Sequence, residues 1–184
     1  GLIYQNGDPA KFAEIQNNLS LVYSDSGELE LAKTTLDRAL NILASKFSIH
    51  QYEMRVVLKN LGSLNIRMEN YKAAEKILTK VLDFEVKNYG LNNRDSIVTR
   101  ANLAQAYSRQ KKYVLAENLF QSSLKQLSVQ KIAWAEQMVL NNLGQVYARQ
   151  KKLELAEIYF LRSIEMSREL SGRGRENLEA INNL

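Results

Sequence analysis

The sequence predicts an all-α protein, an α-solenoid assembled from helix–turn–helix repeats. Three observations support this fold class. The chain of 184 residues contains one proline and eight glycines, and such a composition favours long helices because both residue types disfavour helical backbone. Short motifs recur at an almost constant interval. Within each motif the apolar residues are spaced three, four and seven apart, as on one face of a helix.

Four segments of the chain superimpose, and a fifth begins at residue 182. Their leucines lie at positions 19, 61, 103, 143 and 184, at intervals of 42, 42, 40 and 41 residues. Two antiparallel helices cannot bury their own apolar faces, so successive units must stack. An alanine follows each of the first four leucines after thirteen residues: Ala32, Ala74, Ala116 and Ala156. A large apolar residue follows after seventeen: Leu36, Leu78, Phe120 and Phe160.

The first helices of the four units are expected near residues 9–25, 50–67, 93–109 and 132–149. In each, a small residue follows the leucine, so a neighbouring helix can approach closely. The second helices are expected near 28–46, 70–88, 112–129 and 152–170, after short polar turns. A linker at 172–174 then precedes a ninth helix near 175–184. The small residues are Ser20, Gly62, Ala104 and Gly144.

These elements predict one array over residues 1–184, with repeats at about 9–48, 50–90, 93–130 and 132–171 and a partial fifth at 175–184. The last motif stops at Leu184. Terminal repeats normally carry a polar cap, so we expect the native array to continue or to cover this end with another copy.

The pattern resembles the tetratricopeptide repeat, most clearly in Leu143-Gly144, Tyr147, Ala156 and Phe160 of the fourth unit. The large aromatic that often opens the first helix is absent, as is the proline that ends a standard unit. The period exceeds the usual 34 residues by about eight, and the longer unit is similar to the repeats of kinesin light chains and their bacterial relatives. The resemblance implies a right-handed superhelix whose inner wall is formed by the first helices.

An asparagine precedes each leucine and lies opposite the packing stripe of its helix, since each residue turns the helix by about 100°. An amide both donates and accepts, so a row of them can bond a partner's backbone regardless of its sequence. Related repeats use such a ladder. Alternatively, the amides bond one another and stabilise the stack. The row comprises Asn18, Asn60, Asn102 and Asn142.

Two further rows share this stripe. Arg67, Arg109 and Arg149 can bind acidic side chains or a carboxylate. Alternatively, they offset the helix dipole or pair with the recurring Glu75, Glu117 and Glu157. The other row is apolar and consists of Val56, Val98 and Met138. These side chains either form apolar pockets along the groove or are covered by neighbouring helices.

Composition narrows the class of function. There is no cysteine and one histidine, His50, and no phosphate-binding loop or nucleophile–base spacing occurs. We therefore expect no catalysis, metal or cofactor. No apolar stretch reaches the roughly 18 residues of a membrane span, and we expect a cytoplasmic protein.

The net charge of +5 arises in the second half, where residues 93–184 hold 14 Lys and Arg against 9 Asp and Glu. Residues 1–92 hold 11 of each. An acidic partner would favour the second half. Nucleic acid is not expected, because no aromatic platform accompanies the lysines.

The leading hypothesis is a non-catalytic scaffold that binds a protein or extended peptide in the concave groove. A second is a peptide-sensing domain that controls an attached output domain. A third is a structural array that self-associates through its uncovered ends as a homo-oligomer.

Overall fold

The computed structural model describes the backbone of residues 8–44 and 52–182, and side chains as far as residue 171. Within these residues it contains helices and no strand. The helices are α1 (Pro9–Asp25), α2 (Leu29–Ala44), α3 (Tyr52–Arg67), α4 (Tyr71–Tyr89), α5 (Arg94–Arg109), α6 (Tyr113–Gln130), α7 (Ala133–Arg149) and α8 (Leu153–Asn182).

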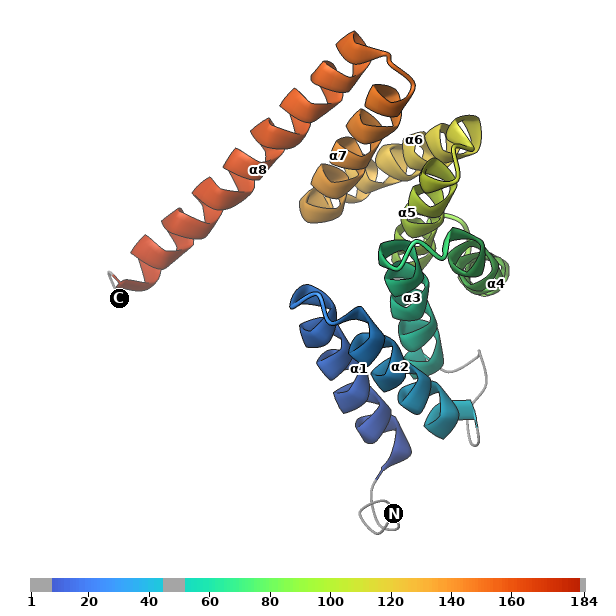
Figure 1. Cartoon of the computed structure of the whole chain (residues 1–184). Coiled ribbons are helices and arrows are strands. Elements are labelled where there is room, and N and C mark those ends of the chain that lie inside the picture. Colours follow the sequence, from blue (N-terminus) through green and yellow to red (C-terminus); the bar gives the residue numbers. More distant parts are fainter. Residues whose placement is uncertain (1–7, 45–51, 183–184) are drawn as a thin grey trace.

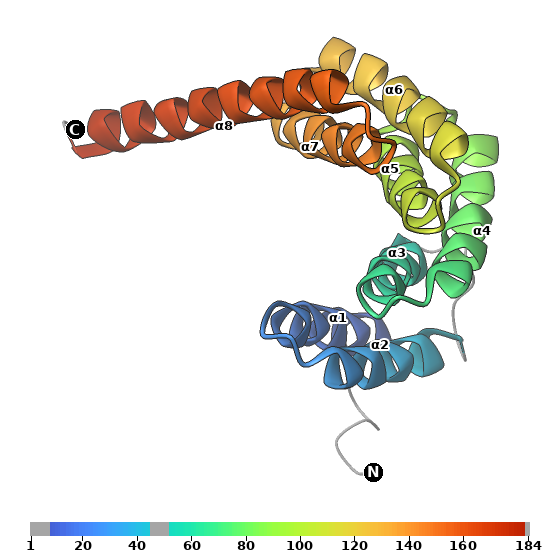
Figure 2. The ribbon, with the colours of Figure 1, turned by 45° about the horizontal axis from the view of Figure 1, so that its top comes forward.

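Consecutive helices pair, and the pairs stack into a curved array (Figure 1). Helices α1, α3, α5 and α7 contact one another in sequence along the inner side of the curve, while α2, α4 and α6 form the outer side (Figure 2). This architecture is the right-handed α-solenoid that the repeat pattern predicts. The inner wall is therefore formed by the first helix of each pair.

The four first helices end in the same kind of turn, with one residue in the left-handed conformation. Such a residue lets the chain reverse while bonding the last helical carbonyls. In the third turn, for example, the backbone N–H of Lys112 donates to the Tyr107 carbonyl over 2.9 Å. The left-handed residues are Gly27 (φ 86°), Glu69 (62°), Lys111 (64°) and Lys151 (61°).

The core consists of the positions that the repeat marks. The four recurring alanines are between 0% and 4% exposed, and Leu36, Leu78 and Phe120 are 0–1% exposed. The predicted close approach at the small residues is confirmed. A Cβ on Gly62 would lie 2.6 Å from the Leu78 side chain, and one on Gly144 would lie 2.7 Å from the Phe160 ring.

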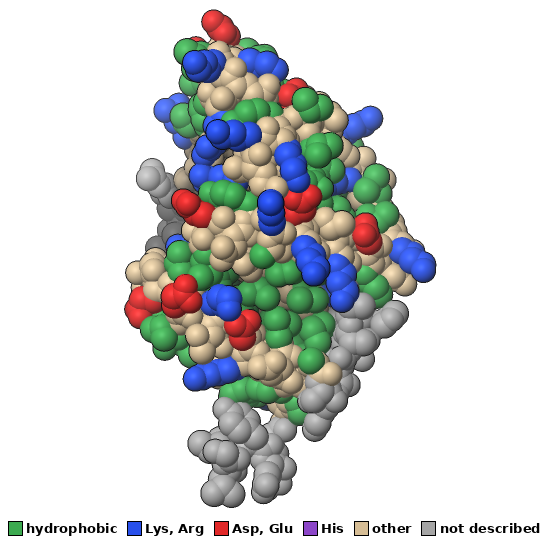
Figure 3. Space-filling view, turned by 45° about the vertical axis from the view of Figure 1, so that its right-hand side comes forward, with side chains coloured by type: hydrophobic (Ala, Val, Ile, Leu, Met, Phe, Trp, Pro, Cys, Tyr) green, Lys and Arg blue, Asp and Glu red, His purple; other side chains and the backbone are tan. Residues whose placement is uncertain are grey.

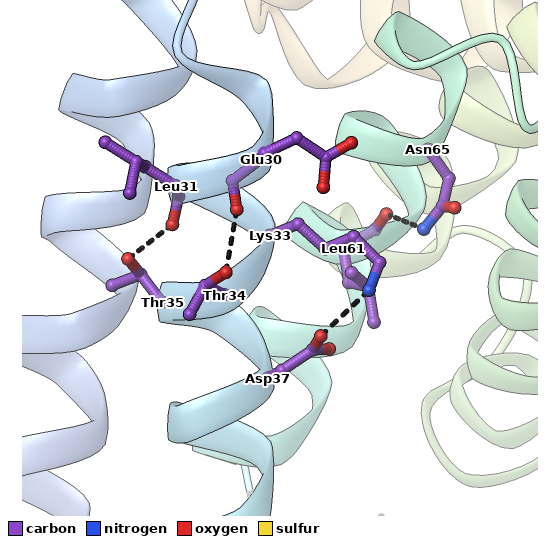
Figure 4. Close-up of polar contacts among 8 residues, drawn as sticks. All are labelled: Glu30, Leu31, Lys33, Thr34, Thr35, Asp37, Leu61 and Asn65. Atoms are coloured by element: carbon purple, nitrogen blue, oxygen red, sulfur yellow. Dashed lines mark hydrogen bonds and ion pairs between the residues drawn. The ribbon is translucent and has the colours of Figure 1, made fainter.

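Local polar contacts support the second and third helices (Figure 4). The hydroxyls of Thr34 and Thr35 donate to carbonyls one turn back, over 2.9 and 2.6 Å. Lys33 and Asp37 form an ion pair at 3.0 Å on the α2 surface. The buried Asn65 donates to the Leu61 carbonyl over 2.8 Å, so its amide is satisfied within its own helix.

The predicted break at 172–174 was wrong, because α8 continues from Leu153 to Asn182 as one helix. Glycine costs about 1 kcal/mol relative to alanine inside a helix. Two glycines flanked by good helix formers therefore weaken a helix without ending it. Residues 175–182 belong to α8 rather than to a separate ninth helix. Residues 45–51, where the second predicted helix was to end, lie outside the described part of the chain.

Candidate binding groove on the inner wall

The predicted asparagines lie one on each of α1, α3, α5 and α7, the helices that follow the inner side of the curve (Figure 2). Asn18 is exposed, and Asn60, Asn102 and Asn142 are half-buried. The side-chain amide of Asn60 donates to Asn17 Oδ1 over 2.7 Å. Asn60 thus makes the kind of stabilising contact that the alternative interpretation proposed.

The other three amides of the row differ from Asn60. Within the described residues, the side chains of Asn18, Asn102 and Asn142 make no hydrogen bond. A half-buried amide without a partner has both its donor and its acceptor available to a ligand. These three amides are therefore free for recognition.

The arginine row is divided in the same way. Arg67 on α3 forms an ion pair with Asp25 of α1 at 3.5 Å and donates to Ser24, so it links two repeats. Arg109 and Arg149 are exposed, and neither forms an ion pair within the described part of the chain. Both guanidinium groups are available to an acidic partner.

The alternative in which the arginines pair with the recurring glutamates does not hold for Glu75 and Glu117. Glu75 binds Lys112 at 2.8 Å and also accepts from Gln110. The hydrogen bond from Lys112 holds the Glu75 pKa below its usual range. Glu117 accepts the Tyr147 hydroxyl over 2.8 Å. Both glutamates therefore connect neighbouring repeats.

The apolar row is half-buried throughout: Val56, Val98 and Met138 are neither fully covered nor fully exposed. Met138 packs against the core cluster between α5 and α7. Val56 contributes to an open pocket.

Two pockets lie on the inner wall between α1 and α3. The larger, which we call the α1–α3 pocket, has a volume of about 340 Å³ and is lined by Glu14, Asn17, Asn18, Tyr52, Glu53, Val56 and Val57. The second has a volume of about 150 Å³ and is lined by Ser20, Leu21, Ser24, Asp25, Leu36, Asn60, Ser63, Leu64 and Arg67. The two pockets between α1 and α3 thus include members of all three predicted rows: Asn18, Asn60, Arg67 and Val56.

Most of the lining residues were not selected from the sequence, and Asn17, Tyr52 and Glu53 are among them. Glu53 lies seven residues before Asn60, so extending the inner stripe by one more helical turn would have found it. Tyr52 opens α3. Asn17 lies beside the row rather than on it, and only the distance to Asn60 reveals its place.

Lys59 on α3 is a cation whose contacts are internal to the chain. Its ammonium group lies 2.9 Å from Asp95 and 3.5 Å from the fully buried Glu85. Lys59 thereby ties α3 to α4 and α5 and is 11% exposed at its side chain. Of the cations discussed for the groove, Arg109 and Arg149 remain available to a ligand.

On the face shown in Figure 3, Lys and Arg side chains are spread among hydrophobic and acidic ones rather than gathered in one patch. Over the described residues, no group of three or more His, Cys, Asp or Glu side chains is placed to hold a metal ion. No helix in that part of the chain combines the length and the apolar character that crossing a membrane requires.

Comparison with protein families agrees with this geometry. Tetratricopeptide repeat models match residues 11–84, 53–127 and 138–176. These matches cover well over half of the chain, which therefore belongs to the tetratricopeptide repeat family. No curated protein matches it.

Several solved structures share the fold. BtubC (BKLC) from P. vanneervenii is 18% identical with a TM-score of 0.72, and the match covers 92% of this chain and 68% of that one. A protein of Podosopora anserina assigned as a kinesin light chain, with nearly identical TPR-like repeats, is 14% identical with a TM-score of 0.73, covering 88% and 77%. The Rap conjugation gene regulator of plasmid pLS20, in complex with the Phr* peptide, is 17% identical with a TM-score of 0.73, covering 91% and 45%. At these identities the likeness concerns the fold, including elongated repeats like those of kinesin light chains.

Proposed function

We propose that this chain is a non-catalytic scaffold that binds an extended segment of another protein in the groove of its inner wall. The observation that carries the proposal is the set of unpartnered amides on α1, α5 and α7. Two pockets between α1 and α3 accompany them on the same row of helices. The proposal takes the chain as one array with units at 9–48, 50–90, 93–130 and 132–171.

The unpartnered amides would bind the backbone of the segment. Asn102 and Asn142 would each donate to a carbonyl and accept from an N–H of the bound backbone, which needs no particular sequence. Arg109 and Arg149, at the ends of the same helices, would bind acidic side chains of that segment. Val56 and its pocket would take a side chain at the other end of the groove.

The test begins by selecting peptide ligands for the wild-type chain from a random display library and measuring their Kd by calorimetry. Changing Asn102→Ala and Asn142→Ala together should weaken binding about 100-fold, since the two hydrogen bonds of each amide together contribute about 1–1.5 kcal/mol. Helicity should not change, because neither amide bonds another described residue.

The matched control changes two exposed asparagines of the outer helices, Asn41→Ala and Asn118→Ala. This control should leave Kd unchanged. Equal affinities for wild type and the Asn102/Asn142 variant would refute binding through the amide row, as would the absence of any selected peptide.

A second candidate is a peptide-sensing regulatory domain. The observation that favours it is the fold shared with the Rap regulator bound to the Phr* peptide. A sensing domain must change shape on binding. Small-angle scattering with and without a selected peptide would show a change in the radius of gyration, whereas an unchanged curve would count against sensing.

A third candidate is self-association through the first helix. Ile15, Leu19 and Val22 of α1 are 58%, 37% and 62% exposed. Their equivalents in α3, α5 and α7 are at most 8% exposed, because the preceding repeat covers them: Val57, Leu61, Leu64, Thr99, Leu103, Ala106, Val139, Leu143 and Val146. A concentration-independent monomer in sedimentation experiments would exclude this candidate, and Val22→Asp should dissociate any oligomer.

A further inference from the structure

The α1–α3 pocket, at one end of the groove, has a lining that is acidic, aromatic and apolar. Glu14 from α1 and Glu53 from α3 are its two charged lining residues. Neither carboxylate forms an ion pair within the described part of the chain. Lys11 lies one turn before Glu14 on α1 but does not line the pocket. The pocket therefore presents two carboxylates, neither of them in an ion pair within the described residues, about a common space.

The remaining walls suit the stem of a long cationic side chain. Val56 and Val57 supply apolar surface, and Val57 is 2% exposed. Tyr52, which is 56% exposed, also lines the pocket, and the Arg55 guanidinium lies 5.9 Å from the centroid of its ring. Lysine and arginine cover apolar surface with their methylene stems while their charged ends reach polar groups.

Asn17 gives an independent indication of a ligand. Its side chain lines the pocket and is 6% exposed. Its Oδ1 accepts from Asn60 over 2.7 Å, whereas its Nδ2 makes no hydrogen bond within the described residues. An amide donor without a protein partner, on a side chain that lines a pocket, is available to an acceptor placed there. The carbonyl of a bound peptide would supply such an acceptor.

We propose that the α1–α3 pocket binds a lysine or arginine side chain of the extended segment, with Glu14 and Glu53 as its anionic partners. This inference rests on the proposed function, since it names one side chain of the groove's ligand. The pocket lies at the opposite end of the inner wall from Arg109 and Arg149. The ligand would thus carry its cation near α1 and α3, and acidic residues near α5 and α7.

Small amide derivatives of single amino acids test the pocket without a known partner. Nα-acetyl-arginine N-methylamide, its lysine analogue and its glutamate analogue would be titrated into the full chain and followed by NMR. The signals observed are the side-chain amides of Asn17 and Asn18 and the methyl groups of Val56 and Val57. For ligands of this size we expect a Kd on the order of 1 mM.

The two cationic derivatives should shift these signals in a saturable way, and the glutamate derivative should not. Comparison of the arginine and lysine arms identifies the preferred cation. Changing Glu14→Gln and Glu53→Gln together should raise the Kd at least about 10-fold, while Glu53→Lys should abolish cation binding. The control Glu30→Gln removes an exposed carboxylate of α2 outside the pocket and should have no effect.

The outcomes separate this inference from the proposed function. If the cationic derivatives bind and their binding depends on Glu14 and Glu53, the cation pocket is supported. If the longer peptides then do not bind, only the proposed function in the groove is refuted. If peptides bind through Asn102 and Asn142 but the derivatives leave the pocket signals unchanged, the cation pocket is overturned. Equal shifts from the glutamate and arginine derivatives overturn it as well.

Discussion

Gly62 of α3 offers a direct test of the close helix approach that builds each repeat. A Cβ at this position would lie 2.6 Å from both Cγ and Cδ2 of Leu78 on α4. Ordinary carbon contacts are about 3.5–4.0 Å. Leu78 is 0% exposed, so it has little room to withdraw. The change Gly62→Ala should therefore force the two helices or the leucine apart.

Two opposing effects determine the magnitude. Alanine is about 1 kcal/mol better than glycine inside a helix, whereas overpacking a core costs about 1–3 kcal/mol. We expect Gly62→Ala to lower the free energy of unfolding by about 1 kcal/mol. If Leu78→Ala is introduced first, the obstacle is gone, and Gly62→Ala should then raise stability by about 1 kcal/mol. The coupling between the two sites is about 2 kcal/mol.

Urea unfolding followed by circular dichroism would measure the four stabilities of this cycle. The control Ala73→Gly, at an exposed position of α4, measures the helix-propensity difference in the same protein. For a chain of this size, 1 kcal/mol corresponds to about 2–4 °C in Tm. A Gly62→Ala variant more stable than wild type, or a coupling near zero, would refute the packing argument.

Three further predictions concern buried polar groups. Arg100 is 2% exposed, and its Nη1 makes no hydrogen bond. The change Arg100→Leu should raise the free energy of unfolding by about 2 kcal/mol, as measured by thermal unfolding. Tyr147→Phe removes the hydrogen bond to Glu117 and should cost about 1–2 kcal/mol in urea unfolding. Burial raises the Glu136 pKa above its usual value. The Glu136 side chain therefore favours folding at low pH, where it is protonated, and loses that contribution as the pH rises and it ionises. The change Glu136→Gln should therefore raise Tm at pH 7 and leave Tm unchanged at pH 3.

Each of these predictions has an internal comparison. The equivalents of Arg100 in the second and fourth units are Leu58 and Leu140, so leucine suits the position, and a less stable Arg100→Leu variant would contradict the reasoning. Tyr159→Phe alters a ring stacked on Tyr147 with a centroid separation of 5.2 Å and should cost less than Tyr147→Phe. A Glu136→Gln effect of equal size at both pH values would exclude titration as its cause.

Much of the fold could be predicted from the sequence because the determining signals are local. The predicted helix boundaries agree with α1 and α3 to α7 within about two residues, since the apolar period and the turn residues act over a few positions. The exception was the end of α8, where Gly172 and Gly174 weaken helical backbone without breaking it.

The candidate site could be predicted only in outline. The sequence placed the asparagine and arginine rows on one helical face, because position on a helix follows from counting residues. Whether an amide is free depends on the distance to a neighbouring helix. Asn60 is bonded to Asn17, 43 positions earlier, while Asn102 and Asn142 remain unbonded within the described residues.

By itself, then, the sequence determined the helical repeat, the small residues at its contacts and the first helices that line the inner side. Tertiary structure alone decided that Arg67 is paired with Asp25, that Arg109 and Arg149 remain available, and that carboxylates of α1 and α3 share one pocket. The physical reason is that hydrogen bonds and ion pairs act over about 3–4 Å. Their partners are set by how the stacked helices are spaced, which a repeat pattern does not specify.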